Sequence, residues 1–181
     1  MIEIENSVLL VIDVQSKLAN LMHDHDVLYH NIERFIKAFQ VLQVPILWTE
    51  QAPDKIGPTV PQIHDLLFPI VKPIAKRSFS CWGSEEFVNQ LRLTNRRQVV
   101  IVGIEAHVCV YQTARDLVSH GFEVFAIADG ISSRSQLNCD RTLARMRQEN
   151  IVVTVGEAII CDLIKTADHP KFKDVMSYIK R

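Results

Sequence analysis

The chain has 181 residues, of which 48% are hydrophobic and 23% charged, so we predict one globular domain over residues 1–181 with a substantial core. Its formal net charge is −1 with both signs scattered, which argues against a nucleic-acid or anionic membrane partner and favours a small-molecule substrate. No apolar run reaches the roughly 18 residues of a membrane span and the start MIEIENSVLL lacks a basic leader, which predicts a cytoplasmic protein.

The first third of the chain alternates between strand and helix patterns. Ser7 to Ile12 is a buried strand that delivers Asp13 at its carboxyl end, and Val27 to Leu42 has apolar residues at helical spacing. Pro45 starts the next strand, PILWT. Glu50 to Pro69 carries four of the seven prolines and no long periodic stretch, which predicts an irregular crossing over the sheet.

The alternation continues to the end of the chain. Ile70 to Ala75 is a weaker, proline-interrupted strand that ends at Lys76, and a helix starts near Ser84. Val99 to Val102 is a continuous β-branched strand, ended by Gly103, after which a helical pattern begins at Val110. The remaining predicted elements are a strand (122–128), a polar loop (129–135), a helix (136–149), a strand (151–155) and two helices (157–164 and 171–179). This order predicts a three-layer α/β sandwich with a six-stranded, mostly parallel sheet.

The four cysteines are far apart and form no CxxC pair, which suits a reduced compartment and argues against a zinc cluster or a disulfide framework. Cys139 and Cys161 are predicted to pack helices. Cys109 points away from the apolar stripe of its helix, so packing does not require it there. It is either a small buried hydrophobe or, because a helix N-terminus favours thiolate, a nucleophile.

Several common motifs are absent. The turn after the first strand, DVQSK, carries neither a dinucleotide nor a P-loop phosphate cradle, and no GxSxG elbow occurs. His23 and His25 alternate in a charged loop without a third partner, which is more typical of solvated surface than of a metal site. We therefore assign no metal and no cofactor.

Three segments taken together resemble the isochorismatase-like cysteine hydrolase family: LLVIDVQ with Asp13, AKRSFSCW with Lys76, and VVIVGIEAHVCVYQTARDL with Cys109. The resemblance covers nearly the whole chain, and the strand-turn-Cys segment and the ADGISSRS loop are specific to it. The segments TEQAPDKIGPTVPQI and DHPKFKDVMSYIK look most like small isochorismatase-domain-containing proteins of unassigned substrate. It implies a Rossmann-like strand order in which strands one and four are adjacent, so that Asp13 and Cys109 share one pocket.

The resemblance also implies a mechanism. Lys76 would hold the Asp13 carboxylate and, with the helix N-terminus, stabilise a Cys109 thiolate. Asp13 would carry the proton, the backbone N–H groups of Glu105 and Cys109 would form the oxyanion hole, and the bond between Ile104 and Glu105 would be cis. The implied reaction is hydrolysis of the C–N bond of a small amide, carbamoyl or imide-like substrate through a thioester on Cys109.

Two departures from the family limit the substrate. Nicotinamidases of this family have an Asp-x-His metal motif after strand two, where this chain reads TEQAP, and isochorismatase itself does not need the cysteine. His107 is an alternative base, although Asp13 is preferred. The substrate-pocket candidates are Gln15, Gln51, Phe79, Trp82, Ala106 and His107. Family members usually associate, which implies a homo-oligomer.

The alternative function is a thiol-based redox sensor or a catalytically silent ligand-binding or interaction protein on the same fold. Sensing needs only an activated thiol, whereas hydrolysis also needs a proton carrier. The joint presence of Asp13 and Lys76 therefore favours an enzyme.

Overall fold

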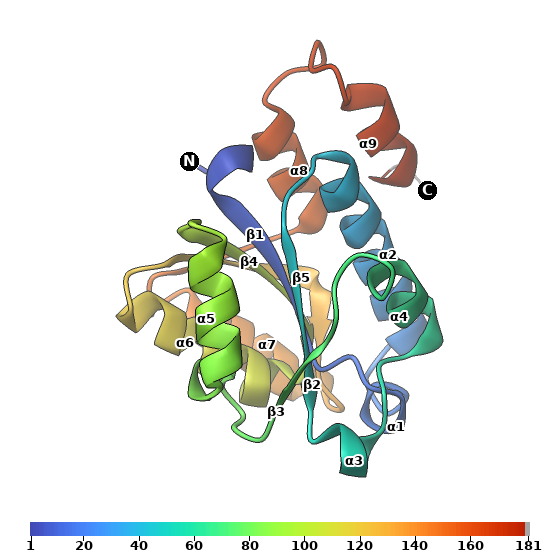
Figure 1. Cartoon of the computed structure of the whole chain (residues 1–181), viewed down its shortest axis with the longest axis vertical. Helices are drawn as coiled ribbons and strands as arrows, with labels where there is room; N and C mark the ends of the chain where they lie inside the picture. The colour runs from blue at the N-terminus through green and yellow to red at the C-terminus, as the bar shows by residue number, and fades with distance from the viewer. Residues whose placement is uncertain (180–181) are drawn as a thin grey trace.

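The computed structural model describes residues 1–179, so the last two residues of the predicted domain lie outside the described residues. A six-stranded sheet in the order β3-β2-β1-β4-β5-β6 forms its centre (Figure 1). The strands are β1 (Ser7–Ile12), β2 (Ile46–Gln51), β3 (Ile74–Lys76), β4 (Gln98–Ile104), β5 (Glu123–Ser132) and β6 (Ile151–Thr154). Every pairing is parallel, which confirms the Rossmann-like order and the adjacency of β1 and β4.

Helices cover both faces of the sheet. They are α1 (Ser16–Ala19), α2 (His25–Val41), α3 (Pro53–Ile56), α4 (Pro61–Leu67), α5 (Glu85–Leu93), α6 (Tyr111–Ser119), α7 (Gln136–Met146), α8 (Gly156–Ile164) and α9 (Phe172–Ile179). Helices α2, α4, α8 and α9 lie on one side of the strands and α5, α6 and α7 on the other (Figure 1). The predicted three-layer sandwich is confirmed.

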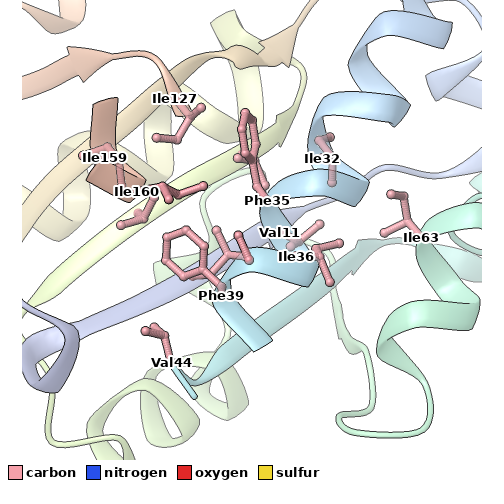
Figure 2. Close-up of a cluster of buried hydrophobic side chains, with 14 of the residues drawn as sticks. Val11, Ile32, Phe35, Ile36, Phe39, Val44, Ile63, Ile127, Ile159 and Ile160 are labelled. Carbon is pink, nitrogen blue, oxygen red and sulfur yellow. The ribbon is translucent and has the colours of Figure 1, made fainter. Parts of the chain in front are cut away.

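Each layer has its own apolar core because successive residues of a strand point to opposite faces. In β1, Leu9 and Val11 pack under α2, whereas Val8 and Leu10 pack on the side of α5 and α6. Figure 2 shows the first core, in which Phe35 and Phe39 of α2 lie against side chains from the strands and from α8. With β1 fully buried on both faces, its carboxyl end is a fixed platform for Asp13.

The stretch from residue 50 to residue 69 is more regular than predicted. Residues 50 and 51 extend β2, and two short helices follow, α3 and α4. Both begin with a proline, Pro53 and Pro61, at the first helical position, where the missing N–H costs no hydrogen bond. Two of the four prolines that suggested irregular structure are therefore helix starts.

Two further strand boundaries differ from the prediction. Strand β3 has only three residues, Ile74–Lys76, because Pro69 and Pro73 cannot donate to a sheet ladder. Gly103 does not end β4 but lies within it, with φ at +125°, where an added Cβ would lie 2.1 Å from the carbonyl oxygen of Ile12. The close packing of β1 on β4 beside the site therefore requires glycine at this position.

The predicted loop at residues 129–135 is partly strand. After an irregularity in its pairing with β4, β5 continues so that Ile131 and Ser132 align with Gly103 and Ile104. This extension brings the segment after Ser132 to the carboxyl end of β4, next to the turn that carries Cys109.

Candidate active site

Asp13 leaves the end of β1 in a left-handed conformation, with φ at 52°. Its side chain is 1% exposed, and both carboxylate oxygens have partners. Oδ2 accepts from Lys76 Nζ at 2.6 Å and Oδ1 accepts from Thr49 Oγ1 at 2.8 Å. Because Thr49 is on the neighbouring strand β2, adjacent parallel strands fix the direction in which this carboxylate points.

Lys76, the last residue of β3, has a fully buried side chain. Besides Asp13, its ammonium donates to Gln51 Oε1 at 2.7 Å and to the carbonyl oxygens of Ser78 and Phe79 at 3.2 and 3.0 Å. Burial opposes the charge, but Asp13, Cys81 and Cys109 together more than offset it, so the pKa of Lys76 is raised above its ordinary value. Lys76 is therefore held as a cation that orients Asp13.

Cys109 lies in a π-helical turn, Ala106–Val110, that directly precedes α6. Such turns are rare and occur frequently at functional sites. The residue is 6% exposed and packs within the core on the α5–α6 side, so the expectation that packing does not require it there is wrong.

The expected thiolate is also wrong for the free protein. Burial, followed by the negative charge of Asp13, raises the pKa of the Cys109 thiol, and the cation at Lys76 offsets only part of this increase. A hydrogen-bonding interaction with Asp13 raises the pKa further. In the absence of substrate, Cys109 is therefore a neutral thiol beside a carboxylate that can take its proton.

A second thiol, Cys81, belongs to the same cluster. It is fully buried in a 3-10 turn (Cys81–Gly83), with its Sγ 3.8 Å from Thr49 Oγ1, and its backbone N–H donates to Thr113 Oγ1 at 2.9 Å. Thr49 thus links this thiol to Asp13. Cys81 lies within the AKRSFSCW segment, in which no sequence pattern gives it a role. Its spacing of five residues from Lys76 was the available signal.

Burial of Cys81 leads to a prediction about stability at alkaline pH. Burial is the largest cause that raises its pKa from 9.0 to about 11. A raised pKa in the folded state stabilises the protein below the unfolded pKa, and this stabilisation is lost as pH rises from about 9 to about 11. Between pH 8 and about pH 10.5, Cys81 should lower the free energy of unfolding by about 2 kcal/mol.

Urea unfolding at both pH values measures this loss. The free energy of unfolding should decrease between pH 8 and about pH 10.5 in both proteins. In Cys81→Ala this decrease should be about 2 kcal/mol smaller than in the unaltered protein. Cys161→Ala is the control because Cys161 is exposed on α8, which also corrects its predicted packing role. Equal decreases in the Cys81→Ala variant and the unaltered protein would contradict the prediction.

The turn between β4 and Cys109 is clamped from β5. The bond between Ile104 and Glu105 is cis, as the family resemblance implied. The Glu105 carboxylate accepts from Arg134 Nε at 3.1 Å, and His107 Nδ1 lies 3.0 Å from Ser133 Oγ. Ser133, just after β5, thus engages His107, whereas the Cys109 thiol interacts with Asp13, which favours Asp13 over His107 as the base.

Gln15 and Gln51, two predicted pocket residues, form an internal brace instead. The Gln15 side chain donates to the carbonyl oxygens of Gln51 and Gly57 and accepts from the Gln51 N–H, at 2.6 to 3.0 Å. The Gln51 side chain accepts from Lys76 and donates to the Arg77 carbonyl oxygen. Both residues therefore position Lys76 and the end of β1.

The other predicted pocket residues lie in different places, and not all of them are at the site. Ala106 is buried in the Cys109 turn, whereas the Phe79 side chain is 54% exposed and the residue reaches the site through its backbone carbonyl. Trp82 is not brought to the site. Its ring stacks on His120, at the end of α6, with centroids 4.0 Å apart. Trp82 follows the buried Cys81 directly and its side chain turns away along α6.

A hollow of about 540 Å³ adjoins the site on the Lys76 side. It is lined by Pro53, Asp54, Ala75, Lys76, Arg77, Ser78, Gly83 and Ser84. Within residues 1–179, no three His, Cys, Asp or Glu side chains are grouped so that they could hold a metal ion. The same part of the chain contains no helix long and apolar enough to cross a membrane.

The comparison with protein families agrees with this geometry. Residues 7–158 match the isochorismatase domain. The chain belongs to the isochorismatase family. This isochorismatase-family chain is 34% identical to isochorismatase domain-containing protein 2 of Danio rerio, over 97% of this chain and 87% of the relative. It is 35% identical to isochorismatase domain-containing protein 2A of Mus musculus, over 97% and 84%.

Solved structures of the isochorismatase fold match along the whole chain. MAR1 ribonuclease from Caenorhabditis elegans has a TM-score of 0.93 and 35% identity, covering 99% of this chain and 92% of that one. The YcaC gene product of Escherichia coli, described as an octameric hydrolase of unknown specificity, has a TM-score of 0.86 and 22% identity, with coverage of 99% and 96%. The likeness to YcaC supports the fold, and the family match supports a hydrolase of the isochorismatase type.

Proposed function

We propose that this protein is a cysteine hydrolase that cleaves the C–N bond of a small amide, carbamoyl or imide-like substrate. Cys109 acts as the nucleophile, Asp13 as the proton carrier and Lys76 as the orienting cation. The observation that carries the proposal is the buried ion pair between Asp13 and Lys76, 2.6 Å long, beside the Cys109 thiol at the carboxyl edge of the sheet. Nucleophile, base and orienting group are the parts that covalent catalysis by cysteine needs.

In the first half of the reaction, Asp13 accepts the thiol proton as Cys109 Sγ attacks the carbonyl carbon. The developing oxyanion accepts hydrogen bonds from the backbone N–H groups of Glu105 and Cys109. The tetrahedral intermediate then collapses, the C–N bond breaks, and Asp13 returns the proton to the departing amine. The acyl group stays on Cys109 as a thioester.

The second half regenerates the thiol. A water molecule gives a proton to Asp13 and its oxygen attacks the thioester carbon. The C–S bond breaks, Cys109 Sγ regains the proton from Asp13, and the acid is released. Because burial raises the pKa of the free thiol, proton transfer to Asp13 is coupled to attack on a bound substrate.

The alternatives are less well supported by the site. A redox sensor needs an accessible, acidic thiol, whereas Cys109 is 6% exposed and its pKa is raised.

The Caenorhabditis elegans relative is named a ribonuclease. In this chain the proposed reactive group is a thiol, which suits attack on a carbonyl carbon. The net charge of −1 also provides no positive electrostatic field that would attract a polyanion such as RNA.

Homo-oligomer formation and a cytoplasmic location remain part of the proposal. Exposed apolar side chains such as Ile70, Leu93 and Val155 are available for contacts between subunits. Sedimentation at micromolar concentration should give a species heavier than one 20.7 kDa chain. A single monomeric species would contradict the oligomer.

A panel of small amides, carbamoyl compounds and ureides, assayed for ammonia release, tests the function. At least one member should be hydrolysed, and mass spectrometry of the quenched reaction should find the acyl group on Cys109. Hydroxylamine should remove that mass, as expected for a thioester. Turnover with no acyl group on Cys109, or turnover that is lost on chelation and restored by a metal ion, would contradict the mechanism.

A further inference from the structure

A second hollow, of about 530 Å³, lies between the ends of α5 and α6. It is lined by Trp82, Arg92, Asn95, Arg96, Arg97, His120 and Phe122. Arg96 and Arg97 directly precede β4, whereas the Cys109 turn directly follows this strand. The length of β4, about 20 Å for seven residues, therefore separates the hollow from the Cys109 turn.

The charge of this hollow is one-sided. Three arginines line it and no aspartate or glutamate does, although the whole chain has a net charge of −1. Arg96 donates to the backbone carbonyl oxygens of Ile4 and Ser7, which fixes its guanidinium. Arg92 and Arg97 have no ion-pair partner within residues 1–179. Two cations thus face the hollow without a carboxylate to neutralise them.

Four other arginines are paired with carboxylates, whereas Arg141 and Arg147 form no ion pair within residues 1–179, so the grouping of arginines in one hollow is what sets it apart. The pairs are Arg77 with Asp54, Arg115 with Asp116, Arg134 with Glu105, and Arg145 with Glu149. Two acids close in sequence to the hollow are engaged elsewhere, because Asp116 pairs with Arg115 and Glu123 accepts from Gln98 Nε2 at 3.3 Å.

The aromatic wall of the hollow is held in place. Trp82 and His120 stack with an interplanar angle of 25°, and Phe122 meets Trp82 edge-on with centroids 5.9 Å apart. His120 Nδ1 lies 2.7 Å from the Asp116 carbonyl oxygen, to which it donates. These contacts place a fixed aromatic wall beside the exposed side chains of Arg92 and Arg97.

We propose that this hollow binds a small, multiply charged phosphate-class oxyanion, with Arg92 and Arg97 as its principal ligands. Guanidinium groups present paired N–H donors that match phosphate oxygens, and two unneutralised cations match a dianion. A volume of about 530 Å³ is within the ordinary range for small-ligand sites and accommodates a diphosphate with an attached group. An alternative role for these arginines is to stabilise the C-terminal end of α5 through the helix dipole. Only Arg92 lies in the last turn of α5, so this role does not explain Arg97.

Tryptophan fluorescence gives a direct measurement. The chain has two tryptophans, and Trp48 is fully buried with its indole N–H donated to Thr59 Oγ1, so Trp82 reports on the hollow. Titration with inorganic pyrophosphate at constant ionic strength should give a saturable change in emission. Trp82→Phe should remove that change, while titration calorimetry on this variant should still detect binding.

Arginine variants identify the ligands. Arg92→Gln and Arg97→Gln should each weaken pyrophosphate binding about tenfold, because each removes a charge-assisted contact. Arg147→Gln is the matched control, since Arg147 is an exposed arginine beyond the end of α7 and does not line the hollow. Circular dichroism confirms that the variants are folded.

Comparing pyrophosphate with a nucleoside 5′-diphosphate shows whether the oxyanion is a free ion or part of a phosphorylated metabolite. Equal affinity for pyrophosphate and a nucleoside 5′-diphosphate supports a site for the free ion, and tighter binding of the nucleotide supports a phosphorylated metabolite. The proposal is overturned if calorimetry detects no saturable binding, if Arg97→Gln binds as tightly as Arg147→Gln, or if only single-stranded RNA binds. None of these outcomes depends on turnover at Cys109.

Discussion

Cys109→Ala is expected to lower kcat/KM for a substrate found in the amide panel by on the order of 10⁴-fold or more, because the other thiol of the cluster, Cys81, is fully buried and cannot replace it as the nucleophile. The loss of one buried sulfur atom should destabilise the fold by only about 1 kcal/mol. Steady-state ammonia release measures the first effect, and thermal unfolding measures the second.

Cys81→Ala is the matched control for this variant. Cys81 is also a buried thiol of the same cluster, but its Sγ contacts Thr49. We expect it to retain turnover within about tenfold, because it supports the orientation of Asp13 only through Thr49. A Cys109→Ala variant with activity comparable to that of Cys81→Ala would show that the nucleophile has been misidentified.

The fold and the placement of Asp13 at a strand end could be predicted from the sequence because both depend on local patterns. Continuous apolar runs mark strands that are buried on both faces, and their carboxyl ends meet at one edge of a parallel sheet. The resemblance added Lys76, which local pattern did not distinguish from a surface lysine. Lys76 is fully buried at the end of β3, a strand of only three residues. Its ammonium donates hydrogen bonds to oxygen atoms of four different residues, which local sequence does not reveal.

The parts that could not be predicted depend on contacts between distant segments. The clamp of Arg134 on Glu105 needs β5 to resume its pairing after an irregularity, which no periodicity signals. Trp82 belongs to the AKRSFSCW segment and is a predicted pocket residue, whereas the 3-10 turn directs its ring along α6 to His120. The state of the Cys109 thiol was misjudged because the effect of helix position was weighed without burial.

The thiol's raised pKa changes how the enzyme would be activated. A thiolate stabilised in the free protein would be exposed to oxidation and alkylation, whereas a buried neutral thiol beside Asp13 is protected until a substrate carbonyl arrives. The proton carrier then matters more than the cation for the chemical step. Lys76 would matter because its ammonium, 2.6 Å from Asp13 Oδ2, orients that buried carboxylate.

Lys76→Met is expected to be the most destabilising of the single substitutions considered. It keeps the length of the side chain but leaves the Asp13 carboxylate buried without its cation. Breaking a buried ion pair in this way costs about 3 to 5 kcal/mol. Chemical unfolding should show this loss, and turnover should fall together with it because Asp13 is no longer held in place.

The exposed pair one residue further along the chain provides the control. Arg77 Nη2 lies 2.9 Å from Asp54 Oδ1, but the two side chains are 68% and 53% exposed. Arg77→Met should therefore change the free energy of unfolding by at most about 1 kcal/mol. A loss as large as that of Lys76→Met would mean that burial is not what makes the Asp13–Lys76 pair important.

A double-mutant cycle separates the pair from the packing around it. Asp13→Asn alone should lower turnover by on the order of 10² to 10⁴-fold, since the amide cannot carry the thiol proton. In Asp13→Asn/Lys76→Met no unpaired charge remains, so the double variant should be about 2 kcal/mol more stable than the sum of the two single losses predicts. Its turnover should stay at the level of Asp13→Asn or below, because restored stability does not replace the proton carrier. Additive losses of stability, or full activity in Asp13→Asn, would contradict the roles given to both residues.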